Sequence, residues 1–381
     1  MIDPQSQVNL QQEISERIVA DRALLDKLRA EISPLRDQVR RIQPRVTTSL
    51  SLVGTDGGNN SLEFDPFLVQ VIRVVDSSNN EYCLDAVTPT TSVSRLSARQ
   101  FNEDGSPRTA LGRMMAYLGV SQLTALSHMI RANESDRPVS PSWVQVYREL
   151  VEWAVLFSLV REKDFGTDTL IVNDGLLRSK VFSSDLFKKY LQGMGEGIET
   201  HARKNRRKVY LAGIAKHSKV LARYRLAMAL EGILATNYPA YLEIPRELEE
   251  KAYVWSEYAR GDDRELENAE VNKFVGGKMF FAKFGSGPRD PIWPIDVFLP
   301  QQNEAQVVLG CMLADALNGF PVPFYPLCLQ RAHENAALVD LDFDILQDHI
   351  FDAIRDILGG QAPILDVFRL QEADPSQRRY Q

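Results

Sequence analysis

Apolar residues recur every three or four positions over residues 8–45, a spacing typical of an amphipathic helix. The pattern predicts a long helix or a pair of helices, with Pro34 kinking or ending the first one. Because a single helix cannot bury its own apolar stripe, this segment packs on the main domain, on a second copy of itself, or on another protein.

After Pro44 the pattern changes to short apolar runs bounded by turn residues, which predict strands. The first three form an antiparallel meander, two of them separated by the turn SSNN, and the last two form a hairpin across a Gly/Pro loop. The predicted strands are residues 49–58, where the strand enters a glycine turn, and residues 67–76, 81–87, 168–173, 209–214, 278–284 and 293–299.

Helical patterns lie between and after these strands, over residues 107–132, 142–162, 183–202, 218–234, 304–318 and 334–358. This order predicts an α/β fold, a mixed sheet with helices on its faces, preceded by an N-terminal helical extension. We divide the chain into a helical segment 1–45 for dimer or partner contact, a main domain 46–358 with a charged helical insertion at about 235–272, and a tail 359–381.

Composition places the chain among ordinary globular proteins, with 44% hydrophobic and 25% charged residues. The three cysteines are far apart and form no CxxC pair, which argues against a zinc ribbon or a disulfide framework and fits a reducing cytoplasm. The polar N-terminus predicts no signal peptide. No apolar run reaches the roughly 18–20 residues that span a bilayer, so we expect no membrane contact.

The formal net charge of −7 hides a basic stripe over residues 201–225, which contains many cations and no carboxylate. Such a stripe can bind nucleic acid on an otherwise acidic protein, or it can be a solvated basic helix or loop. The candidate DNA contacts are Arg203, Lys204, Arg206, Arg207, Lys208 and Lys219.

Two aspartates, Asp56 and Asp174, each follow a predicted buried strand and precede glycine. Glycine lets the backbone turn sharply, so both carboxylates can point into one space, where a divalent cation would offset their repulsion. Oxygen ligands suit magnesium or manganese. A single Asp-Gly is more often a plain turn, but two at strand ends strengthen the metal interpretation.

Glu152 lies among apolar residues on the predicted helix before the second of these strands. It either reaches a metal or pairs with Arg148 one turn earlier, and Glu149 on the same face is the rival ligand. Two or three carboxylates around divalent ions suit phosphodiester hydrolysis.

Three further residues complete the candidate site. Lys216 follows a buried strand and could hold the scissile phosphate, although it could equally be an ordinary surface cation. Tyr325 and His333 flank a predicted helix start, where His333 could bind metal or donate a proton, or be structural. The sequence contains no P-loop, GxSxG or dinucleotide fingerprint.

Together these motifs resemble the NurA family of DNA end-processing nucleases. The resemblance rests on four segments in the family's order over roughly residues 50–346: GTDGG, LIVNDGLL, GIAKHS and FYPLCLQRAHENA. One departure is DGG, where the family commonly has DGS.

The resemblance implies an RNase H-like core and a two-metal site that favours manganese. It implies nuclease activity on single-stranded DNA and duplex ends, and a homodimer that works with HerA, a hexameric DNA-translocating ATPase, in end resection or anti-phage defence. By position it makes Asp56, Glu152, Asp174 and His333 the metal ligands, and Lys216 and Tyr325 further site residues. Two alternatives remain: an inactive scaffold of a translocase complex, and an RNase H-like enzyme that acts on RNA or a hybrid.

Overall fold

The computed structural model describes residues 3–54, 61–64, 67–140, 142–252, 274–337 and 340–359. Asp56 therefore lies outside the described residues, as do the second half of the predicted insertion and nearly all of the C-terminal tail.

Ten strands form one mixed sheet in the order β1-β8-β9-β10-β7-β6-β2-β4-β3, with β5 pairing to β4. Three neighbouring strands, β2, β6 and β7, run parallel, and their antiparallel neighbours β4 and β10 flank them. The strands are β1 (Arg40–Arg41), β2 (Thr48–Gly54), β3 (Ser61–Phe64), β4 (Phe67–Asp76), β5 (Glu81–Val87), β6 (Thr169–Asp174), β7 (Val209–Ile214), β8 (Ala240–Glu243), β9 (Gly277–Lys283) and β10 (Ile292–Phe298).

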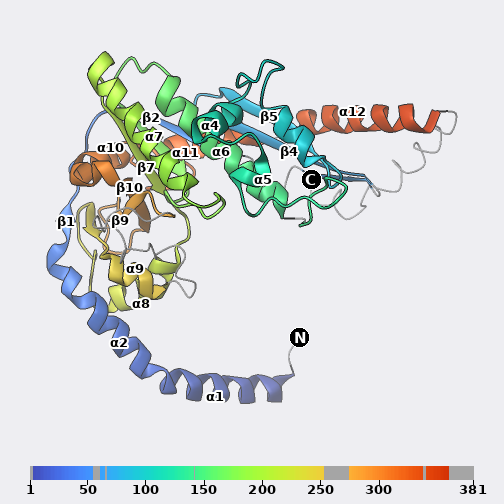
Figure 1. Ribbon diagram of the computed structural model, residues 1–381. Coiled ribbons are helices and arrows are strands. Elements are labelled where there is room, and N and C mark those ends of the chain that lie inside the picture. The colour runs from blue at the N-terminus through green and yellow to red at the C-terminus, as the bar shows by residue number, and fades with distance from the viewer. Residues whose placement is uncertain are drawn as a thin grey trace.

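Helices cover both faces of this sheet, which is why β7 is buried along its whole length and reads as a continuous apolar run (Figure 1). On one face α4 (Ala110–Leu118), α6 (Trp143–Glu162) and α7 (Leu186–Thr200) share a core with Ile171 and Leu211. On the other face α10 (Ala305–Ala316) and α11 (Leu327–Ala336) pack against Leu170 and Tyr210. Alternate residues of each strand thus serve opposite cores.

Further elements connect or extend these layers. The short ones are α3 (Val93–Ala98), α5 (Leu123–Leu126), the π-helical turn η2 (His201–Asn205), α9 (Arg246–Ala252) and the 3₁₀ turn η4 (Leu299–Glu304), and the longer ones are α8 (Lys219–Leu230) and α12 (Asp340–Leu358). Among the described helices, none combines the length and apolar character needed to cross a membrane.

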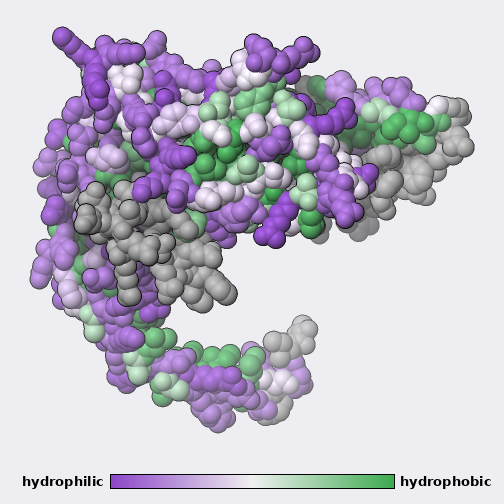
Figure 2. Space-filling model, in the orientation of Figure 1, coloured by the Kyte–Doolittle hydropathy of each residue, from purple (hydrophilic) through white to green (hydrophobic). Residues whose placement is uncertain are grey.

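The N-terminal segment forms an arm that leaves the body of the protein (Figure 1). It consists of α1 (Pro4–Ala20), α2 (Arg22–Ile32) and the 3₁₀ turn η1 (Ser33–Gln38). Ile32 and Leu35 anchor its base in a core shared with α8 and β8. Figure 2 shows apolar side chains along one side of the arm, and those of Ile14 and Ile18 are exposed.

The predicted mixed α/β sheet with flanking helices and an N-terminal helical extension is confirmed. Several element predictions were wrong. Residues 107–132 and 334–358 each divide into two helices, whereas the predicted N-terminal helix pair is present, divided at Asp21 and with α2 ending two residues before Pro34. Ala240–Glu243, predicted as part of a helical insertion, form strand β8 of the main sheet, because their backbone pairs with β1 and β9 and the side chains of Ala240, Tyr241 and Leu242 are buried.

Candidate functional site

The carboxyl ends of the parallel strands β2, β6 and β7 lie at one edge of the sheet. Leu52 pairs with Asn173, and Asn173 pairs with Gly213, so the three strands end side by side. Open α/β sheets place their ligand sites outside such carboxyl ends. Asp174 is the last residue of β6, and Lys216 follows two residues after the end of β7.

Four of the predicted site residues meet at this edge. The Asp174 Oδ2 atom lies 3.0 Å from His333 Nε2, and Lys216 Nζ lies 2.8 Å from the same nitrogen. The Tyr325 hydroxyl lies 3.4 Å from Asp174 Oδ1. These contacts join residues that are distant in the sequence: Asp174 and Tyr325 are separated by 151 positions, and Lys216 and His333 by 117.

Helix α11 positions two members of this cluster. Pro326 precedes its first residue, so the chain turns at Tyr325, and His333 lies one to two turns further along the same helix. The Tyr325 ring packs against Trp293 of β10 at a centroid distance of 4.9 Å. Trp293 in turn donates from its indole nitrogen to the Phe324 carbonyl, which fixes the approach to the helix.

The electrostatics of the cluster favour an ionised Asp174. Burial alone raises the pKa of its carboxyl, but His333, Lys216 and Tyr325 together bring that pKa below its ordinary value. Burial and the Asp174 charge raise the pKa of Tyr325 far above the physiological range. Tyr325 is therefore a neutral hydrogen-bond donor, and it does not act as a base.

The ring nitrogen Nε2 of His333 lies within hydrogen-bond distance of both a carboxylate and an ammonium group, which make opposite demands on its protonation. If Nε2 carries a proton, it donates to Asp174 but faces the Lys216 ammonium. If it carries none, it accepts from Lys216 but presents its lone pair to the Asp174 carboxylate. One nitrogen cannot satisfy both neighbours at once.

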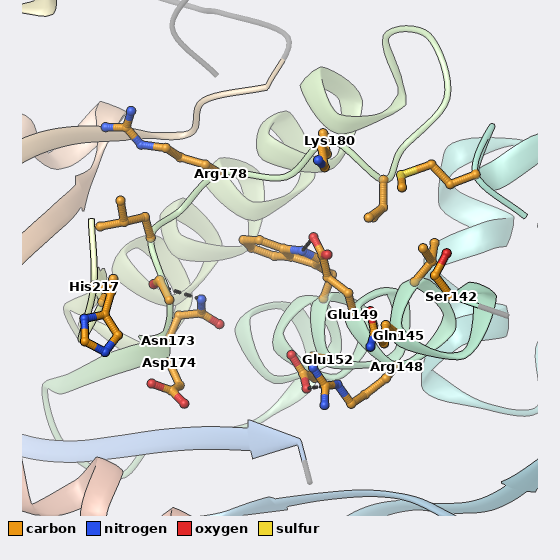
Figure 3. Close-up of a pocket in the computed structure, with 17 residues that line it drawn as sticks. Ser142, Gln145, Arg148, Glu149, Glu152, Asn173, Asp174, Arg178, Lys180 and His217 are labelled. Carbon is orange, nitrogen blue, oxygen red and sulfur yellow. Dashed lines mark hydrogen bonds and ion pairs between the residues drawn. The ribbon is translucent and has the colours of Figure 1, made fainter. Parts of the chain in front are cut away.

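A pocket of about 610 Å³ opens beside Asp174, between β6 and the first half of α6. Figure 3 shows Glu152, from α6, and Asp174, from β6, within it. The other polar and charged lining residues are Ser142, Gln145, Arg148, Glu149, Asn173, Arg178, Lys180 and His217.

The two candidate glutamates of α6 have different environments. Glu149 accepts a hydrogen bond from the Ser179 hydroxyl at 2.6 Å and one from the Trp153 indole at 3.2 Å. Glu152 forms an ion pair with Arg148 at 3.5 Å, and its side chain is 30% exposed. The carboxylate of Glu149 therefore holds helix α6 to the loop after β6, whereas that of Glu152 pairs with Arg148 within its own helix.

The basic stripe is divided by strand β7. Arg203, Lys204, Arg206, Arg207 and Lys208 precede the strand, whereas Lys216 and Lys219 follow it. Six residues at about 3.3 Å each separate the two groups by roughly 20 Å. Carboxylates also lie beside the first group in the structure. Arg203 pairs with Glu199, and Lys208 lies 3.7 Å from Glu304. Only Lys219 of the six predicted DNA contacts lies near the edge that carries Asp174.

Sequence reasoning missed Arg178, which lines the pocket four residues after Asp174. Its guanidinium bonds both carboxylate oxygens of Asp296, at 2.7 and 2.8 Å, and pairs with Glu249 at 2.6 Å. These partners come from β10 and α9, so no local pattern could reveal them. His217 was also missed, although its position next to Lys216 in GIAKHS was a usable signal.

Within the described ranges, no group of three or more His, Cys, Asp and Glu side chains is arranged to hold a metal ion. Asp174 and His333 provide two adjacent ligand atoms at the sheet edge. Asp56 stands two residues after Gly54, the last residue of β2, in the sequence.

The sequence matches no protein-family model and no curated protein. In structure the chain is similar to two solved structures of NurA. One, NurA bound to dAMP and manganese, has a TM-score of 0.41 at 12% identity, covering 93% of this chain and 99% of that chain. The other has a TM-score of 0.42 at 13% identity, covering 89% and 97%.

Proposed function

We propose that this protein is a divalent-metal-dependent nuclease that hydrolyses DNA at the edge formed by β2, β6 and β7. The observation that carries the proposal is the conflict at His333 Nε2, which lies within hydrogen-bond distance of both Asp174 and Lys216. A divalent cation held by Asp174 and His333 resolves it, because the imidazole then presents its lone pair to the cation and Lys216 is released.

The residues at this edge fit such a cation. Asp174 supplies an ionised carboxylate and His333 an imidazole nitrogen, which together suit Mn²⁺ or Mg²⁺ with Mn²⁺ favoured by the nitrogen ligand. Glu152, and Asp56 by its place in the sequence, would complete the ligand set for two ions. When bound, divalent cations polarise a scissile phosphate and promote attack by water.

The remaining residues act on the substrate directly. Lys216, once released from His333, can donate to a phosphate oxygen and stabilise the charge that develops there. Tyr325 stays protonated and orients Asp174 through its hydroxyl. The pocket beside Asp174 contains Arg148, Lys180 and His217, which can neutralise neighbouring phosphates of a DNA strand.

A second candidate function is an inactive scaffold of a translocase complex. The absence of a three-ligand group within the described ranges favours it. The convergence of Asp174, Lys216 and His333 argues against it. A purely structural role would not require three such groups around one nitrogen that cannot satisfy both of its neighbours.

We also propose the assembly that the sequence motifs suggest: a homodimer that acts with a HerA-type hexameric ATPase, in DNA end resection or anti-phage defence. The exposed apolar side of the arm gives a surface for either contact. Light scattering on the purified chain, alone and with the ATPase, measures both stoichiometries. A strictly monomeric chain that does not co-elute with the ATPase would contradict the assembly.

Degradation of end-labelled linear DNA in Mn²⁺ tests the nuclease proposal, with and without the ATPase, on wild type, Asp174→Asn and Asp185→Asn. Asp185 is an exposed aspartate just before α7, and its side chain makes no cap hydrogen bond, so it is a matched control. We expect wild type and Asp185→Asn to degrade DNA and Asp174→Asn not to. RNA and RNA–DNA hybrid substrates, tested in parallel, show which type of nucleic acid the protein cleaves. Inactivity of the wild type on every substrate would favour the scaffold.

A further inference from the structure

A second pocket, of about 600 Å³, lies over the other half of α6 and shares no lining residue with the pocket beside Asp174. We call it the Arg108 pocket. It lies between the start of α4, the second half of α6 and the turn that joins β4 to β5. Its lining residues are Asn80, Tyr82, Arg108, Thr109, Ala110, Arg113, Val155, Ser158, Leu159, Glu162 and Lys163.

Three cations and a single carboxylate line the Arg108 pocket. Arg113 pairs with that carboxylate, Glu162, at 2.9 Å. Lys163 donates to the Tyr82 hydroxyl at 3.1 Å and pairs with the buried Asp76 carboxylate at 3.7 Å. Arg108 is exposed and makes no ion pair within the described ranges, so its guanidinium is available to a ligand. Among the described residues, Arg108 is thus the pocket cation that has no carboxylate partner.

The amino end of α4 adds donors to the same space. The Thr109 side chain caps the helix by accepting from the Gly112 amide. Within the described ranges no acceptor bonds the amide of Ala110, which lines the pocket. A helix start with free amides attracts an anion, and α4 is nine residues long.

Ser158 gives an independent sign that a polar ligand belongs here. It lines the pocket from α6, and its side chain is nine-tenths buried. Its hydroxyl has no hydrogen-bond partner among the described residues. Because a buried hydroxyl without a partner is costly, an acceptor that enters the pocket would satisfy it.

We propose that the Arg108 pocket binds a phosphate group, carried by a free nucleotide or by the end of a nucleic-acid strand. A phosphate offers oxygens in several directions, which matches donors that come from Arg108, the start of α4 and Ser158. The volume exceeds that of a phosphate alone and accommodates the nucleoside attached to it. The proposal does not depend on the nuclease function, since the two pockets are separate.

Binding is measured by calorimetry on the full chain in metal-free buffer, where metal-dependent cleavage does not proceed. The probes are inorganic phosphate, dAMP, and one oligonucleotide with either a 5′-phosphate or a 5′-hydroxyl. Wild type is compared with Arg108→Gln and with Arg137→Gln, an exposed arginine outside the pocket that makes no ion pair within the described ranges. Arg108→Gln breaks no described ion pair, so it should fold normally.

We expect Arg108→Gln to bind the phosphate-bearing probe about tenfold more weakly, and Arg137→Gln to bind it as wild type does. Binding of inorganic phosphate and dAMP identifies a free nucleotide as the ligand. Binding of only the 5′-phosphorylated oligonucleotide identifies a strand end. Equal affinity for the phosphorylated and hydroxyl oligonucleotides with no binding of the small probes, or equal affinities in wild type and Arg108→Gln, would overturn the proposal.

Discussion

Arg178 holds the turn that follows Asp174, and its replacement by methionine should cost much of the protein's stability. The arginine side chain is 3% exposed and bridges Asp296, at 0%, and Glu249, at 1%. Arg178→Met keeps much of the aliphatic volume but leaves both carboxylates buried. Of the two carboxylates, Glu249 alone retains a cation within the described ranges, because Arg246 lies 3.3 Å away from it.

Breaking a buried ion pair by removing one partner costs about 3–5 kcal/mol, since the remaining charge has lost its solvation and its counter-charge. We expect a loss of about 4 kcal/mol in the free energy of unfolding, a large part of the roughly 5–15 kcal/mol of a whole domain. Adding Asp296→Asn to Arg178→Met should recover about half of the loss, because it removes the carboxylate that has no other ion-pair partner among the described residues.

Urea unfolding followed by circular dichroism at pH 7 measures both variants. The pH dependence gives an internal check. Burial raises the pKa of Glu249, although Arg178 lowers it, so the folded state holds the proton more tightly than the unfolded state. Removing Arg178 removes an interaction that lowers this pKa, so Glu249 takes up its proton at a higher pH in the variant than in wild type, and the deficit of Arg178→Met should be smaller at pH 5 than at pH 7. A loss under about 1 kcal/mol, or no recovery with Asp296→Asn, would refute the reasoning.

Three further predictions follow from neighbouring contacts. Gly213→Ala should cost about 1–3 kcal/mol in unfolding free energy and reduce DNA cleavage, because the added Cβ would lie 2.3 Å from the Gly175 carbonyl oxygen in the turn after Asp174; unchanged thermal stability would contradict it. Glu152→Gln should lower the cleavage rate about a hundredfold with little change in melting temperature, whereas Glu149→Gln should mainly lower the melting temperature; the reverse pattern would make Glu149 the ligand. Asp76→Asn should cost about 2–3 kcal/mol at pH 7.

The pH dependence of the Asp76 variant has a definite sign. Burial raises the pKa of Asp76, but hydrogen bonds from Asn80, Tyr82 and Ser78 outweigh it and leave that pKa below its ordinary 3.8. The stability that the carboxylate contributes is therefore present above that value and is lost as pH falls through the lower pKa of the folded state. Urea unfolding of wild type and Asp76→Asn should converge as pH drops below about 4; a constant difference down to pH 2 would contradict the assignment.

Local patterns predicted the strands well because each is a short apolar run that ends at polar turn residues. The predicted bounds of β4, β5 and β7 coincide with those in the structure. The same logic placed Asp174 at the end of β6 and Lys216 just beyond β7. Parallel neighbouring strands then bring the two residues to one edge, which the sequence pattern could suggest but could not establish.

Contacts between distant segments were beyond the sequence. Arg178 reads as an ordinary surface cation until Asp296, 118 residues later, is seen beside it. The basic stripe looks continuous in the sequence, but a buried strand passes through it and puts its two parts at opposite edges of the sheet. Strand β8 was predicted as helical because its four residues adjoin a charged, helix-forming stretch, and the neighbouring strands β1 and β9 override that preference.

Calorimetric titration with Mn²⁺ tests the central claim most directly, because it does not require the right DNA substrate or the ATPase. We would compare wild type, Asp174→Asn and His333→Gln with His349→Gln, a control at an exposed histidine of α12. The account predicts Mn²⁺ binding by wild type and His349→Gln, and binding at least about tenfold weaker in the two site variants. Equal Mn²⁺ affinity in all four proteins, or none in the wild type, would contradict a metal centre at Asp174 and His333.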